Sequence, residues 1–238
     1  MPVHEDITMG GFLKQYWLDI QSDLPPKYPD DECRQGPFKS WGSVLCDIDM
    51  ITKALKILKP EKVIELGTFE ALGTIKMAEA ISNYTSIGKL WTFDSDEPLE
   101  RENIKGVITS KVMKNWQEDE KWKEWKNVVA ERRKNLDKTF NGCEIIYIDG
   151  LISETLSPLL KEIGHWDFCF HDSSHTTPEI RGEFGLLEPF SKVGSIIVFD
   201  DVPINDHAFY IWFTSNRSDT WDFQHSGKGH GQLWAEKK

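Results

Sequence analysis

The sequence predicts an α/β fold, with a mainly parallel sheet that has helices on both faces. Short, almost continuously apolar runs alternate with longer stretches of helical periodicity, a pattern typical of parallel strands buried on both sides. Two of these runs, Asp167–His171 and Ser195–Phe199, end directly before Asp172 and before the pair Asp200-Asp201. Because ligands of open α/β sheets bind outside the carboxyl ends of the strands, these aspartates mark a candidate site.

Length and charge restrict the class of protein. The 238 residues suffice for one large domain, and the net charge of −11 argues against nucleic acid or an anionic membrane as the main partner. We expect the basic run Lys121–Lys134 to be the solvated face of a helix. The four cysteines form no C-x-x-C pair, which argues against a disulfide framework or a zinc site. The chain begins without a signal-peptide pattern and has no membrane-spanning apolar stretch, so the expected location is cytoplasmic.

The first half of the predicted fold follows from apolar spacing and from turn residues. A helix is expected over Leu45–Leu58, because Ile48, Ile51 and Leu55 share one face and a proline follows its end. The other elements expected here are a helix at Gly11–Gln21, a strand at Val63–Leu66, a helix from there to about Ile81 and a strand at Leu90–Asp94.

The second half begins with a long connection, residues 95–143, with a predicted helix at Trp122–Phe140. Its residues 98–121 are expected to be an inserted lid, with a peripheral helix as the alternative. A helix is expected to start at Thr177-Pro178, with a cap residue and a proline in the first turn. The remaining expected elements are strands at Glu144–Ile148, Asp167–His171 and Ser195–Phe199, helices at Glu154–Ile163 and Phe209–Phe213, and closing antiparallel strands at Trp221–Gln224 and Gln232–Ala235. The sheet then has seven strands.

The segment from Val63 to Thr74 predicts a strand, a glycine turn and the start of a helix. It matches neither the dinucleotide fingerprint nor the P-loop, so an ordinary strand-to-helix turn remains an alternative. Glu65, inside the apolar strand, needs a cationic or N–H partner, and a ligand's ammonium group would suit it. Asp94 ends the next strand, where an acidic side chain accepts both hydroxyls of a ribose. An ammonium group together with a ribose points to S-adenosylmethionine more than to NAD.

Four motifs, in order at strand ends, carry a family resemblance: Glu65-Leu-Gly67-Thr-Phe, Thr92-Phe-Asp94, Phe168-Cys-Phe-His-Asp172-x-x-His175 and Val198-Phe-Asp200-Asp201-Val. Over roughly residues 45–201 the chain resembles the Rossmann-like class I S-adenosylmethionine-dependent methyltransferases. Among these it is most similar to metal-dependent O-methyltransferases of the catechol and caffeoyl-CoA type and to their bacterial relatives. The resemblance implies S-adenosyl-L-methionine and Mg²⁺, or another divalent cation, as cofactors.

The resemblance also implies roles for individual positions. The catalytic base is His175, where catechol-type enzymes have a lysine, and the metal ligands are Asp172, Asp200 and Asp201. The cofactor-binding residues are Glu65, Gly67, Thr68, Phe69, Gly73, Asp94, Gly150, Ile152 and Asp172. The chain departs from the family pattern with Ala71 in place of glycine, Gly73 in place of serine and the apolar Leu151 after Gly150. Thr74 is a candidate to replace the missing serine hydroxyl.

The implied reaction is methylation of a hydroxylated small molecule, in which the cation orients the acceptor oxygen and His175 takes its proton. Three alternatives remain: a metal-independent methyltransferase for an oxygen, nitrogen or carbon acceptor, a non-haem iron oxygenase using His171, His175 and Asp172, and a non-catalytic cofactor-binding homologue. We expect residues 1–43 to be a cap on the substrate side and residues 44–238 to be the methyltransferase domain. The acceptor pocket is expected from residues 1–43, 98–121 and 202–216. Similar enzymes often form homodimers, so the resemblance makes a homodimer one possible state of this protein.

Overall fold

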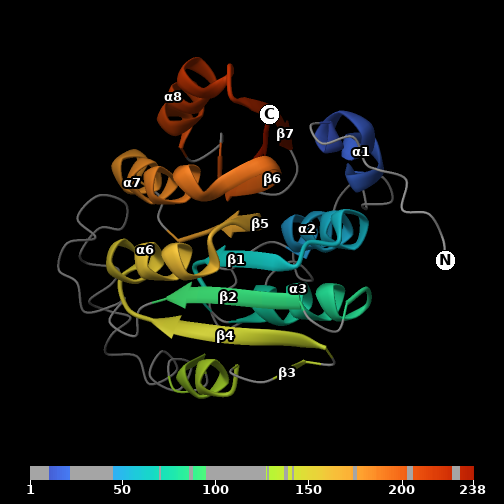
Figure 1. The fold of residues 1–238 in the computed structure, drawn as a ribbon, viewed down its shortest axis with the longest axis vertical. Coiled ribbons are helices and arrows are strands. Elements are labelled where there is room, and N and C mark those ends of the chain that lie inside the picture. The colour runs from blue at the N-terminus through green and yellow to red at the C-terminus, as the bar shows by residue number, and fades with distance from the viewer. Residues whose placement is uncertain are drawn as a thin grey trace, which may run out of the picture.

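One sheet organises the chain (Figure 1). The computed structural model describes residues 11–21, 45–69, 71–85, 88–94, 127, 129–136, 139–140, 142–173, 176–202, 206–226 and 231–238. The strands are β1 (Lys62–Leu66), β2 (Gly88–Asp94), β3 (Thr139–Phe140), β4 (Cys143–Asp149), β5 (Trp166–His171), β6 (Ser191–Asp200), β7 (Trp221–Ser226) and β8 (Gln232–Lys237). Their order across the sheet is β3-β4-β2-β1-β5-β6-β8-β7.

The predicted mainly parallel arrangement is confirmed. Strands β4, β2, β1, β5 and β6 run parallel, and β8 and β7 close the sheet in antiparallel pairing. These are the seven strands expected from the sequence. The two-residue β3 adds an antiparallel edge beside β4, so the predicted helix is wrong at Thr139 and Phe140. Pairing with β4 takes precedence there over helical periodicity.

The helices are α1 (Phe12–Gln21), α2 (Leu45–Leu58), α3 (Leu72–Ser82), α6 (Ile152–Ile163), α7 (Thr177–Leu187) and α8 (His207–Arg217), with a 3₁₀ turn at Glu188–Phe190. Residues 129–134 are also helical. The other predicted helices are confirmed, with ends that move by a few residues. The helix predicted at Trp122–Phe140 is confirmed at 127 and 129–134 and is wrong at Asn135 and Leu136, while residues 122–126, 128 and 137–138 lie outside the described residues. Helix α7 begins one residue earlier than predicted: Thr176, and not Thr177, is the cap position, and Thr177 is the first helical residue, before Pro178.

Helices lie on both faces of the sheet (Figure 1). Alternate residues of each strand point to opposite faces, so the sheet has two cores. On one face, Val63 packs with apolar residues of α1, α2 and α3. On the other face, Ile64 and Leu66 pack with residues of α6, α7 and α8. Because both faces are covered, the parallel strands are apolar on both sides, and a polar side chain among them needs a special reason.

Helix α1 is fixed to the antiparallel end of the sheet through a buried carboxylate on β8. The backbone N–H groups of Gly11, Phe12 and Leu13 donate to the Glu236 side chain on β8, at 2.9–3.0 Å. These N–H groups lack partners within the helix, and the carboxylate also matches the positive end of the helix dipole. Trp17 packs its ring against Trp234 in the same core. Helix α1 therefore shares the core of the domain.

Two expectations lie at least partly outside the described residues. The candidate lid at 98–121 does so entirely, and the proposed N-terminal cap at 1–43 is described only over 11–21. Among the described helices, none has the length and apolar character needed to cross a membrane.

Candidate functional site

The predicted site residues gather where neighbouring parallel strands end. Strand β1 lies between β2 and β5, and β6 lies on the other side of β5. Gly67 follows β1, Asp94 ends β2, Asp172 follows β5, and Asp200 ends β6. The topology therefore brings to one edge of the sheet residues that are up to 133 positions apart (200 − 67) in the sequence.

Gly67 allows two of these strand ends to come together. Its φ is +99°, and a Cβ atom there would lie 2.1 Å from the carbonyl oxygen of Asp172. The Gly67 N–H donates to the Phe93 carbonyl at 2.9 Å, and the Asp172 N–H donates to the Leu66 carbonyl at 2.8 Å. Only glycine satisfies both the backbone angle and this close approach.

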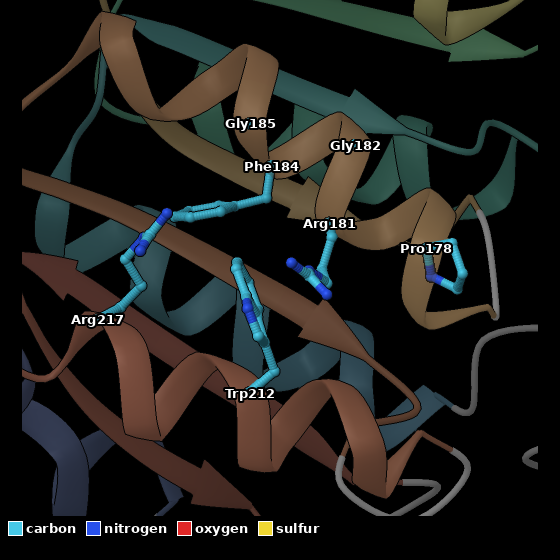
Figure 2. Close-up of a pocket in the computed structure, with 7 residues that line it drawn as sticks. All are labelled: Pro178, Arg181, Gly182, Phe184, Gly185, Trp212 and Arg217. Atoms are coloured by element: carbon cyan, nitrogen blue, oxygen red, sulfur yellow. The ribbon is translucent and has the colours of Figure 1, made fainter.

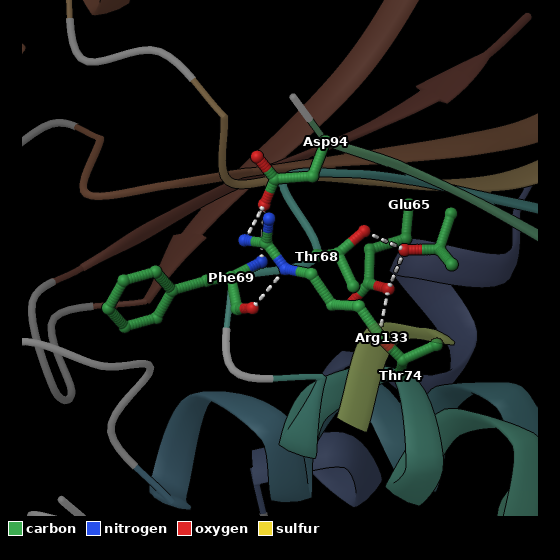
Figure 3. A network of polar contacts seen from close by, with 7 residues as sticks. Glu65, Thr68, Phe69, Thr74, Asp94 and Arg133 are labelled. Atoms are coloured by element: carbon green, nitrogen blue, oxygen red, sulfur yellow. Dashed lines mark hydrogen bonds and ion pairs between the residues drawn. The ribbon is translucent and has the colours of Figure 1, made fainter. Parts of the chain in front are cut away.

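Glu65 is a buried carboxylate held by hydroxyl groups. Its Oε2 accepts from Thr74 Oγ1 at 2.5 Å and from Thr92 Oγ1 at 2.6 Å (Figure 3). Burial raises the pKa of Glu65 to about 8, although these two hydroxyls lower it. The Thr74 hydroxyl is thus directed at Glu65, and its role in place of the missing serine stays a prediction. Thr68 Oγ1 lies 2.6 Å from Thr92 Oγ1 and extends the chain of hydroxyls.

Asp94 joins the end of β2 to the glycine turn. Its Oδ2 accepts the Phe69 N–H at 2.7 Å and forms an ion pair with Arg133 Nη2 at 2.5 Å (Figure 3). Arg133 Nε also donates to the Phe69 carbonyl at 2.8 Å. Both backbone groups of Phe69 are therefore fixed by the same pair of charged side chains. We call Glu65, Thr68, Phe69, Thr74, Thr92, Asp94 and Arg133 the glycine-turn cluster.

The other predicted cofactor residues border this cluster or the next strand end. Gly73 lies in the first turn of α3, where an added Cβ would be 3.3 Å from Glu65 Oε1. Gly150, at φ +128°, donates its N–H to the Asp94 carbonyl at 2.9 Å. Ile152 opens α6, half-buried. All of them lie along the ends of β1, β2 and β4.

The three aspartates predicted as metal ligands influence one another; we call them the acidic strand ends. Asp200 is buried, and desolvation raises its pKa well above the usual range. The carboxylates of Asp172 and Asp201 raise that pKa further, whereas a 2.9 Å hydrogen bond from Gln232 Nε2 lowers it. Asp201 has a left-handed backbone, with φ 61°. Carboxyl groups are therefore crowded at the ends of β5 and β6, where burial and mutual repulsion oppose the ionisation of Asp200.

The chemistry of these side chains fits a hard divalent cation, which prefers carboxylate oxygens and would relieve their mutual repulsion. The geometry is less complete: in the described part of the chain, no three histidine, cysteine, aspartate or glutamate side chains form an assembled metal centre. The donor set is thus suitable in kind, without being preassembled.

The predicted base, His175, lies outside the described residues. The preceding histidine, His171, is buried, with Nε2 2.7 Å from Glu183 Oε2 on α7. Ser173 Oγ donates to the same Glu183 oxygen at 2.7 Å. Glu183 therefore connects α7 to the residues on both sides of Asp172.

A separate hollow of about 510 Å³ lies between α7 and α8 (Figure 2). Two guanidinium groups, those of Arg181 and Arg217, lie 4.4 and 5.2 Å from the centre of the Trp212 ring. Its lining residues are Pro178, Arg181, Gly182, Phe184, Gly185, Trp212 and Arg217, which include none of the predicted cofactor or metal residues. Trp212 thus lines a hollow that is distinct from the predicted cofactor and metal residues.

Sequence reasoning missed three residues of the site. Arg133 belongs to the basic run that we expected to be solvated, yet it is only 6% exposed, so that expectation is wrong at this position. Thr92 and Gln232 hydrogen-bond Glu65 and Asp200. A polar residue inside an apolar strand was the available signal for Thr92. The partners of Arg133 and Gln232 are distant in sequence, so nothing local indicated them.

Fold and site together define a class. The chain has the features of a class I methyltransferase. Its parallel strands have the order β4-β2-β1-β5-β6, and β8 and β7 form an antiparallel end. A glycine turn follows β1, and an acidic residue ends β2. The sequence profile of the family described as "Methyltransferase domain" matches residues 64–202, and the chain belongs to this family. The resemblance to the class I S-adenosylmethionine-dependent methyltransferases, drawn from the four motifs, is confirmed.

Solved structures show the same fold at low sequence identity. They include a proposed caffeoyl-CoA O-methyltransferase from Staphylococcus aureus (TM-score 0.55, 12% identity, 94% of this chain and 99% of that chain covered). Another is an O-methyltransferase from Bacillus cereus in complex with SAH (TM-score 0.51, 15% identity, 98% of this chain and 94% of that chain covered). A third is the O-methyltransferase TomG from Streptomyces achromogenes in complex with SAM (TM-score 0.55, 14% identity, 94% of this chain and 96% of that chain covered). No curated protein matches the sequence.

Proposed function

We propose that this protein is an S-adenosylmethionine-dependent O-methyltransferase that acts on a hydroxylated small molecule with the help of a divalent cation. The observation that carries the proposal is the pairing of two unlike sites at one sheet edge. The glycine-turn cluster offers two carboxylates beside a glycine turn, and the acidic strand ends offer three more. The O-methyltransferases of similar fold from Bacillus cereus and Streptomyces achromogenes, solved with SAH and with SAM, support the cofactor.

The cofactor, when bound, supplies an electrophilic methyl carbon. Glu65 is proposed to accept its ammonium group, which replaces lost hydration of the buried carboxylate. Asp94 is proposed to accept the ribose hydroxyls. Gly67, without a side chain, leaves room for close approach of the backbone, while Gly73, Thr68 and Phe69 border the methionine part. Gly150 and Ile152 are proposed to border the adenine.

The acidic strand ends are proposed to hold the cation through Asp172, Asp200 and Asp201, with Asp172 also at the border of the cofactor. A divalent cation, when bound, lowers the pKa of the acceptor hydroxyl and orients it. His175 is proposed to take the proton, because imidazole titrates near neutral pH. Glu183 holds Ser173 and faces His171, so it steadies the backbone on both sides of Asp172.

A metal-independent methyltransferase is the second candidate, favoured by the lack of an assembled three-ligand centre in the described residues. One experiment separates the two. Purified protein is incubated with S-adenosylmethionine and a panel of catechols and other hydroxylated acceptors, with Mg²⁺ or with EDTA, and methylated product is measured by mass spectrometry. Turnover that needs Mg²⁺ supports the proposal. Full turnover of metal-stripped protein in EDTA supports the second candidate, and no turnover with any acceptor contradicts both.

A further inference from the structure

Arg133 is a cationic side chain in an unexpected place. It comes from the connection between β2 and β4, within helical residues 129–134, and it is 6% exposed. Its neighbour Lys134 is exposed, as is usual for a basic helical residue. Burying a guanidinium group costs free energy unless charged and hydrogen-bonding partners compensate for the lost water. The contacts of Arg133 therefore deserve an explanation.

Those contacts tie together two chain segments of the glycine-turn cluster (Figure 3). Nη2 pairs with Asp94 Oδ2 at 2.5 Å, and Nε donates to the Phe69 carbonyl at 2.8 Å. The Phe69 N–H returns to the same Asp94 oxygen at 2.7 Å. Arg133, Asp94 and Phe69 thus form a closed ring of three polar contacts, and the planar guanidinium fixes two acceptors at a defined angle.

The ring encloses a strained turn. Phe69 and Ala71 have φ values of 43° and 62°, in the left-handed region that residues with a side chain rarely adopt. Such conformations persist only where the surroundings hold them, and they are concentrated at functional sites. The N–H and the carbonyl of Phe69 are both held by the ring. Arg133 therefore supports the backbone conformation at the position where a ligand would approach.

Arg133 also moderates the charge of the cluster. Asp94 raises the pKa of Glu65, and Arg133 lowers it. The guanidinium group thus offsets the effect that the Asp94 charge has on the second carboxylate. An arginine at this point allows two carboxylates to face one ligand at a smaller cost in repulsion.

We propose that Arg133 is a positioning residue of the cofactor site, which holds Asp94 and the Phe69 backbone in the arrangement that accepts the ribose. This inference rests on the proposed function. Arg133 acts through Asp94, so its loss should weaken discrimination for the ribose hydroxyls as well as overall affinity. A purely structural role would lower thermal stability and leave that discrimination unchanged.

The test compares Arg133→Ala, Arg133→Gln and Arg133→Lys with the control Lys134→Ala, which removes an exposed positive charge from the same helix. Calorimetry measures the dissociation constant of S-adenosylhomocysteine and of its 3′-deoxyribose analogue for each protein, with thermal unfolding in parallel. We expect Arg133→Ala and Arg133→Gln to weaken S-adenosylhomocysteine binding by roughly 10-fold to 100-fold. In these two variants, the ratio of the dissociation constants of the deoxy analogue and of S-adenosylhomocysteine should fall toward one. Arg133→Lys should recover part of the affinity through its charge, and Lys134→Ala should match wild type.

A double variant adds a second readout. On an Asp94→Asn background, the further change Arg133→Gln should cost little affinity, because the residue through which it acts is already altered. Wild-type ribose discrimination in a folded Arg133→Gln protein would overturn the inference, even if Arg133→Ala does not fold. Failure of the proposed function looks different, because wild-type protein would then not bind S-adenosylhomocysteine at all.

Discussion

The two halves of the candidate site solve the problem of buried carboxylates in different ways. In the glycine-turn cluster, the chain supplies its own compensation: hydroxyls for Glu65, and a guanidinium and a backbone N–H for Asp94. At the acidic strand ends, the neighbours that act on Asp200 include two more carboxylates and one amide. The first half is organised before a ligand arrives, whereas the second retains a group of carboxyls whose joint ionisation a bound cation would favour.

The largest effect is expected where the two halves touch. Gly67→Ala places a Cβ 2.1 Å from the Asp172 carbonyl oxygen at a φ of +99°. Steric overlap and left-handed strain together should lower the free energy of unfolding by about 2–5 kcal/mol. Urea denaturation measures this. The matched control is Gly182→Ala, on α7, where an added Cβ has nothing within 4 Å and should stabilise the helix slightly. Equal stability of Gly67→Ala and wild type would contradict the close contact between Gly67 and the Asp172 backbone.

The next effect tests the acidic strand ends alone. Mg²⁺ should raise the unfolding temperature of wild-type protein, with a stabilisation of about 2.7 kcal/mol at a hundred times the dissociation constant. Asp200→Asn should remove this response, because it deletes one of the proposed ligand carboxylates. Asp219→Asn, at an exposed turn, should retain it. Thermal unfolding is measured with Mg²⁺ and with EDTA. A wild-type unfolding temperature that is the same in both would contradict the proposed cation site.

A pH experiment tests the glycine-turn cluster. The pKa of Glu65, about 8, means that the free protein holds a proton there at neutral pH. An ammonium-bearing ligand favours the carboxylate, so binding should release a proton, and affinity for S-adenosylhomocysteine should rise by up to about tenfold per pH unit between pH 6 and 8. Calorimetry in buffers of different ionisation enthalpy measures the number of protons released on binding. Glu65→Gln should abolish both the proton release and the pH dependence of the affinity. Affinity independent of pH in wild type would argue against this contact.

The same shift has a consequence for stability with a definite sign. The unfolded chain releases the Glu65 proton near pH 4.5, while the folded chain keeps it to about pH 8. The contribution of this group to stability is therefore fully present below pH 4.5 and is lost as pH rises to about 8. Urea denaturation of wild type and of Glu65→Gln across this range should show a steeper decline for wild type; parallel curves would contradict the shift.

The smallest effect concerns one hydroxyl. Thr92→Val deletes the donor to Glu65 Oε2 and leaves the shape of the side chain nearly unchanged. The expected loss is about 1–3 kcal/mol of unfolding free energy, because a buried polar partner loses a hydrogen bond. Thr214→Val on α8, whose hydroxyl only bonds carbonyls of its own helix, should cost less in the same urea titration. Equal costs would show that the hydroxyl chain contributes no more than an ordinary helical threonine.

The sequence predicted the frame of both halves better than their interior. Apolar runs such as Ser195–Phe199 and the glycine after Val63–Leu66 locate the strand ends, because periodicity and backbone freedom are local properties. The contact of Gly67 with Asp172 depends on β1 and β5 being neighbours, a long-range fact. The burial of Arg133 depends likewise on where its helix packs, so a charged run that reads as solvated can hide a site residue.

In the proposed function, the glycine-turn cluster binds the cofactor through Glu65 and Asp94. The most direct test of this binding is calorimetric titration of S-adenosylhomocysteine into wild type and Asp94→Ala, with Asp219→Ala as the control. The account predicts saturable binding at one site in wild type and in the control, and a loss of roughly tenfold or more in affinity in Asp94→Ala. Absence of binding to wild type, or equal affinity in all three proteins, would contradict it.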